Sequence, residues 1–60
     1  MSQMWEAVAE YEDGTRIEKM FPYTANGNYE KECSEQYDIE CWLLKQHPRC
    51  TYYSVTYVEG

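Results

Sequence analysis

The sequence has 60 residues, of which 11 are acidic and 5 are basic, so its formal net charge at pH 7 is −6. A chain of this length folds as one domain with a small core, and its acidic balance disfavours direct binding to nucleic acid or anionic membranes. Its 7 tyrosines, 2 tryptophans and 1 phenylalanine favour an ordered domain over an acidic disordered tail.

The cysteines Cys33, Cys41 and Cys50 are odd in number and lack the paired spacing of a disulfide scaffold. The N-terminal residues have neither the positive start nor the apolar run of a signal peptide. No apolar run of the sequence approaches the length needed to cross a bilayer. We therefore expect a cytoplasmic protein whose cysteines act as small apolar residues.

Two strands and a tight turn are predicted at the start of the chain, over residues 4–12 and 15–21, where apolar and polar residues alternate. A two-residue turn would mix charged and apolar side chains on each face of the hairpin. A three-residue turn over residues 12–14, with Gly14 in the left-handed conformation, pairs Ala9 with Ile17 and Glu10 with Arg16. We predict this bulged turn because it sorts the two faces.

A helix and a third strand are predicted next. Asn28 is a suitable helix N-cap, and Pro48 disfavours helical geometry in the residue before it, so the helix should end near Gln46 or His47. Residues 50–58 are rich in β-branched and aromatic side chains, which favour a strand. The sequence thus predicts one α+β domain of order ββαβ, with an antiparallel sheet of strand order 2-1-3 and the helix on one face.

A helical wheel at about 100° per residue predicts one broad apolar arc, with Ile39 at its edge, that packs on the sheet. The members of the arc are Tyr29, Cys33, Tyr37, Cys41, Leu43 and Leu44. Trp42 falls on the opposite side, where helix residues are normally solvated. Either the loop before the helix covers half of Trp42, or Trp42 anchors a contact with a partner, as tryptophans often do at interfaces.

Glu40 lies near the middle of the predicted arc, where an unpaired carboxylate is costly. We expect a structural partner for it in preference to catalysis with a raised pKa. The candidate partners are Arg16, Lys19, His47 and a tyrosine hydroxyl.

The third strand sends Tyr57 to one face of the sheet and Tyr52 to the other, so both faces are partly apolar although one helix covers only one of them. An uncovered face or a long apolar edge favours pairing with another chain, and we expect a homodimer. The residues predicted to bind a partner are Trp42, Glu35, Asp38, Tyr52 and Tyr57.

Zinc and nucleophilic chemistry are not supported by the cysteines and the single histidine. Cys50 could approach His47 in space, but nothing else completes a catalytic set. The spacing of these two residues with Cys33 and Cys41 matches no zinc pattern, and the latter two would lie about 12 Å apart along a helix.

The acids Glu10, Glu12 and Asp13 would suit a divalent cation in a metal-dependent hydrolase. Turn chemistry accounts for Asp13, however, and solvated strand faces account for the two glutamates. We predict no enzyme activity, no metal and no cofactor, with the hydrolase kept as an alternative.

Trp5, the Glu-Asp-Gly turn, the helical segment QYDIECWLL and the following Pro48 give the chain a likeness to one class of proteins. It resembles the short acidic proteins of phages and mobile elements in gut Firmicutes, some of which inhibit bacterial defence systems. The resemblance includes anti-CRISPR proteins that occupy nucleic-acid sites with acidic surfaces. It implies a module that binds and modulates a host protein with a basic surface. A self-assembling structural module is the alternative.

Overall fold

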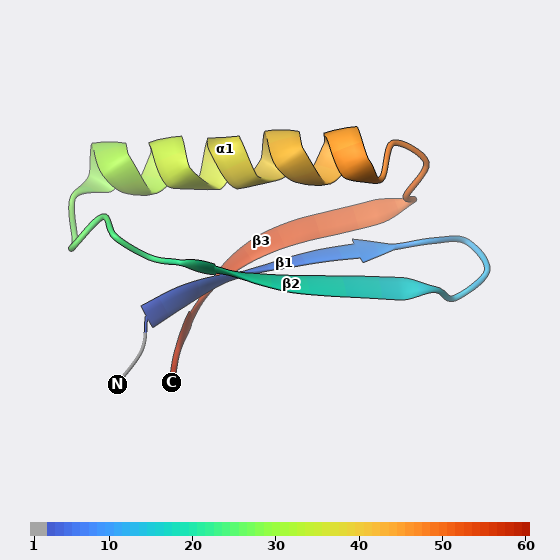
Figure 1. The fold of residues 1–60 in the computed structure, drawn as a ribbon, viewed down its shortest axis with the longest axis horizontal. Helices are drawn as coiled ribbons and strands as arrows, with labels where there is room; N and C mark the ends of the chain where they lie inside the picture. The colour runs from blue at the N-terminus through green and yellow to red at the C-terminus, as the bar shows by residue number, and fades with distance from the viewer. Residues whose placement is uncertain (1–2) are drawn as a thin grey trace.

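A three-stranded antiparallel sheet with one helix on one face forms the domain (Figure 1). The computed structural model describes residues 3–60. Its elements are β1 (Gln3–Glu10), β2 (Arg16–Pro22), α1 (Tyr29–Gln46) and β3 (Tyr52–Glu59). The strand order is β2-β1-β3. The predicted α+β fold and strand order are therefore confirmed.

The hairpin of β1 and β2 has the predicted register, in which Ala9 lies opposite Ile17. At its turn the Tyr11 backbone N–H donates to the Thr15 carbonyl over 2.8 Å. Gly14 has a φ of 94°, which a residue with a Cβ rarely adopts. This three-residue turn sends every second residue of β1 toward the helix.

Arg16 joins both strands on the open side of the hairpin. Its guanidinium lies 2.5 Å from a Glu10 carboxylate oxygen and 2.6 Å from one of Glu18. The predicted cross-strand pair of Glu10 and Arg16 is therefore confirmed. All three side chains are exposed, so this network adds little to stability.

The core lies between β1 and α1 and is small. Ala7 and Ala9 are completely buried on β1, and their short side chains let the helix approach the middle of the sheet. Trp5 is 4% exposed, and the helix contributes Ile39 and Leu43 to the same cluster.

The helix is rotated relative to the wheel prediction. Ile39 and Leu43 point to the sheet, and they are the buried residues of α1. Most of the predicted arc is exposed instead: Tyr29, Cys33, Tyr37, Cys41 and Leu44. Of the predicted arc only Leu43 is buried, so the prediction of the buried helix face is wrong.

Polar side chains on the inner side of α1 explain this rotation. Glu35 accepts a hydrogen bond of 2.9 Å from the buried Trp5 indole N–H. Gln36 donates to the Val55 carbonyl on β3 over 3.3 Å. A buried indole N–H without an acceptor would be costly, so the helix turns Glu35 inward and leaves apolar residues outside.

The N-terminal end of α1 forms as predicted. Asn28 is the N-cap, and its side-chain oxygen accepts from the Lys31 backbone N–H over 3.2 Å. The preceding turn contains Asn26 and Gly27, both with positive φ. This turn reverses the chain from β2 and sets where the helix begins.

Candidate functional site

The most unusual surface of the domain is an exposed apolar stripe along α1, which we call the outer face of α1. It consists of Tyr29, Cys33, Tyr37, Cys41 and Leu44. The two tyrosines are 76% and 65% exposed and Leu44 is 40% exposed. Residues four apart lie on the same side of a helix, so these side chains form one continuous stripe.

Neighbouring side chains within the outer face contact each other. The neighbouring Cys33 side chain raises the pKa of Tyr29 above its ordinary value. Cys41 likewise raises the pKa of Tyr37. Both tyrosines therefore stay neutral at pH 7.

Carboxylates border the outer face. Glu30 and Asp38 are exposed and Glu40 is half-buried along the same helix. Lys31 and Lys45 are the exposed basic residues of α1. The border is acidic on balance, as is the whole chain.

Trp42 does not lie on the outer face. Its ring packs edge-on against Phe21 of β2, with centroids 5.2 Å apart and planes at 73°. Lys19 lies 5.9 Å from the same ring, and His47 is the third neighbour. Of the two alternatives for Trp42, half coverage is observed, but the rings that cover it belong to Phe21 of β2 and to His47 at the end of the helix. A role for Trp42 in binding a partner stays a prediction.

Glu35 is a structural residue at the inner side of the helix. Besides Trp5 it accepts from the hydroxyl and the backbone N–H of Thr24. The Thr24 and Trp5 hydrogen bonds lower the pKa of Glu35 below its usual value, since they favour the charged form. Its carboxylate is thus ionised at neutral pH without a direct cationic partner among residues 3–60.

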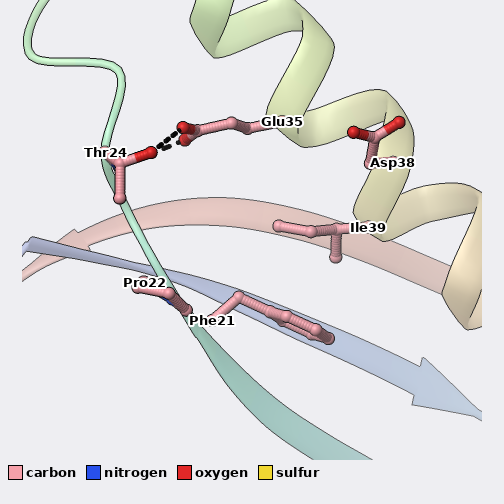
Figure 2. A pocket seen from close by; sticks show the side chains of 6 residues that line it. All are labelled: Phe21, Pro22, Thr24, Glu35, Asp38 and Ile39. Carbon is pink, nitrogen blue, oxygen red and sulfur yellow. Dashed lines mark hydrogen bonds between the residues drawn. The ribbon is translucent and has the colours of Figure 1, made fainter.

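An open pocket lies between α1 and β2, with a volume of about 240 Å³. Its lining residues are Phe21, Pro22, Thr24, Glu35, Asp38 and Ile39. Figure 2 shows Ile39 directed toward the sheet, Glu35 bonded to Thr24 and Asp38 directed away from the sheet. Two of the predicted binding residues, Glu35 and Asp38, therefore meet at this pocket.

Tyr52 and Tyr57 lie on opposite faces of β3, as predicted. Tyr57 is 41% exposed and packs beside Trp5 and Tyr23 on the helix-covered face. Tyr52 is 55% exposed and pairs with Glu10, whose side chain lies on the face that the helix leaves open. The structure does not bring Tyr52 together with the helical residues.

Two of the predicted partners of Glu40 bind other groups. Arg16 binds Glu10 and Glu18, and the Nδ1 atom of His47 lies 2.7 Å from the Tyr11 hydroxyl. Because the helix is rotated, Glu40 is half-buried at the side of the helix and not within a buried arc.

The groups considered for catalysis or metal binding are dispersed. Cys33 and Cys41 are exposed on the helix, whereas Cys50 packs beside the core. Asp13 accepts from the Thr15 backbone N–H over 2.9 Å, which explains its place in the turn. Its interactions with the Thr15 side chain and then the Thr15 backbone lower its pKa. Across residues 3–60, no three histidine, cysteine or acidic side chains are grouped so as to hold a metal ion.

The wheel prediction assigns the residues of the outer face to the core and therefore does not identify this surface. Their spacing of four was visible in the sequence, but it defines a stripe without saying whether that stripe points inward. The indole N–H of Trp5 needs an acceptor, and Glu35 supplies it. Because Glu35 lies on the side of the helix opposite Tyr37, this hydrogen bond indicates that the stripe points outward.

Comparison with family models, curated proteins and solved structures finds no match to this chain. In the described part of the chain, the helix lacks the apolar length that crossing a membrane requires.

Proposed function

We propose that this protein is a binding module, not an enzyme, and that the outer face of α1 docks on a basic surface of another protein. In keeping with the resemblance drawn from the sequence, the partner would be a host protein that handles nucleic acid, which the module modulates or inhibits. The carboxylates beside the stripe would then meet basic side chains that otherwise face phosphates.

The observation that carries this proposal is the exposure of Tyr29, Tyr37 and Leu44 on one side of a helix whose other side already fills the core. Tyrosine is enriched at interfaces and among the residues that contribute most to binding. Amphipathic helices commonly bind partners through anchors spaced by one turn. The net charge of −6 adds long-range attraction to a basic partner.

Capture from a lysate of the host, followed by identification of the bound protein, tests the proposal. Binding should weaken steeply between about 50 and 200 mM salt, because exposed charges are screened. The double variant Tyr37→Ser/Leu44→Ser should lose the captured protein while it keeps the fold. Circular dichroism of the variant checks the fold.

The matched control is Tyr52→Ser/Met20→Ser, which removes two side chains of similar exposure from the open face of the sheet. This control should capture the partner as well as the unaltered chain does. Capture that survives the helix variant, or that does not change with salt, would contradict the proposal.

A second candidate function is self-assembly through the open face of the sheet. Within residues 3–60 no element covers this face, where Met20 is 45% and Tyr52 55% exposed (Figure 1). Light scattering at micromolar concentration would reveal a homodimer. A single species of 7.2 kDa would eliminate this candidate.

A further inference from the structure

We propose that the pocket between α1 and β2 receives an arginine side chain of the protein partner. This inference rests on the proposed function, because it names the chemical group by which a basic partner is recognised. Asp38 lines the pocket and follows Tyr37 of the outer face, so the two side chains project about 100° apart around the helix, and a partner that wraps around this side of α1 contacts both. One partner surface would therefore cover the stripe and reach the pocket.

The apolar part of the pocket suits the methylene stem of a long side chain. Phe21 and Pro22 line it from β2, and Ile39 lines it from the helix. Its volume of about 240 Å³ lies below the roughly 300–1,000 Å³ of sites for drug-sized ligands. A single side chain of a partner fits this size better than a free small molecule does.

The charged part of the pocket suits a cation. The Asp38 carboxylate is exposed at the mouth, and Glu35 is held inside by its bonds to Thr24 and Trp5. These bonds come from neutral donors, so the negative charge of Glu35 is not cancelled by them. Lys31 lies close enough to lower the pKa of Glu35, but it does not line the pocket.

Lys19 shows that a cation is accommodated beside the rings of Phe21 and Trp42. Its ammonium lies 5.6 Å from the centre of the Phe21 ring and 5.9 Å from that of Trp42. Cations are attracted to aromatic faces at such distances. Lys19 is exposed and outside the pocket lining, so it would oppose an incoming cation by charge repulsion.

Arginine fits this combination better than lysine. Its planar guanidinium stacks on aromatic rings and pairs with a carboxylate through two hydrogen bonds. It also loses less hydration on leaving water than an ammonium does. At this pocket Phe21 supplies a ring for stacking, and Asp38 supplies a carboxylate for pairing.

Nuclear magnetic resonance titration of the ¹⁵N-labelled chain with Nα-acetyl-arginine amide tests this inference. Saturable shifts are expected at the amides of Phe21, Thr24, Asp38 and Ile39, with affinity in about the millimolar range for one side chain. Nα-acetyl-lysine amide should bind more weakly. Nα-acetyl-citrulline amide has nearly the shape of the arginine probe without its charge and should give no saturable shift.

Three single variants sharpen the test. Asp38→Asn should weaken arginine binding by about threefold, the size expected for one exposed ion pair. Lys19→Gln should strengthen binding because it removes the opposing charge. Glu30→Gln changes an exposed acid of the same helix outside the pocket, and it should leave the affinity unchanged.

The inference is overturned if citrulline and arginine probes give equal shifts, if the shifts fall elsewhere, or if Asp38→Asn binds arginine as the unaltered chain does. Its failure is distinguishable from failure of the proposed function. If only the arginine inference fails, the Tyr37→Ser/Leu44→Ser variant still loses the captured protein. If the proposed function fails, capture survives that variant.

Discussion

Glu35 determines how the helix meets the sheet, because a single carboxylate holds two other segments of the chain. It accepts from the indole of Trp5 on β1 and from Thr24 in the loop before the helix. Trp5 is only 4% exposed, so its N–H has little access to water as an alternative acceptor. The rotation of α1 thus follows from the hydrogen-bonding needs of one buried side chain.

The variant Glu35→Gln should lower the free energy of unfolding by about 1.5 kcal/mol at pH 7, since hydrogen bonds to a charged acceptor are stronger than those to an amide. These bonds lower the pKa of Glu35 from its ordinary value of 4.5. The stabilisation is therefore complete above about pH 4.5 and is lost as the pH falls through the folded-state pKa. Urea unfolding of both proteins at several pH values measures the difference.

The control is Glu12→Gln, an exposed acid at the hairpin turn, which should change stability little at any pH. A Glu35→Gln effect that stays constant down to pH 2 would contradict the role assigned to the ionised carboxylate.

At the scale of elements, the hairpin was predictable in detail and the helix only in part. Alternation over β1 and β2 and the need for a left-handed residue at Gly14 allowed one register, and that register is observed. The ends of the helix were predictable from Asn28 and Pro48, which are local signals.

The rotation of the helix was not predictable from a wheel. Apolar residues lie on both sides of α1, and the inner side also carries Glu35 and Gln36. The choice between the two sides depends on a contact between residues 30 positions apart, Trp5 and Glu35. The pocket could not be predicted either, because its two walls meet only after this rotation is set.

The adjacent leucines of α1 test its rotation. Leu43 is 1% exposed and Leu44 is 40% exposed. Leu43→Ala should reduce the free energy of unfolding by about 3 kcal/mol, because it leaves a cavity in a small core. Leu44→Ala should reduce it by less than about 0.5 kcal/mol. Equal losses in urea unfolding would contradict the observed orientation.

For the whole molecule, one helix has two tasks. Its inner side packs on a small core that buries only some of the apolar residues of the helix. Its outer side exposes the other apolar residues to solvent. Under the proposed function, the acidic chain would dock the outer face of α1 on a basic surface. The fold thus supplies a rigid support for the stripe.

The thiols of Cys33 and Cys41 are natural reporters of this outer face, because both are exposed. The most direct test of the account measures their rates of alkylation by iodoacetamide, resolved by peptide mass, in the free chain and in the captured complex. We predict fast reaction of both thiols in the free chain and strong protection of both in the complex, with Cys50 slow throughout. Reaction of Cys33 and Cys41 at the same rate in both states would contradict docking through the outer face of α1.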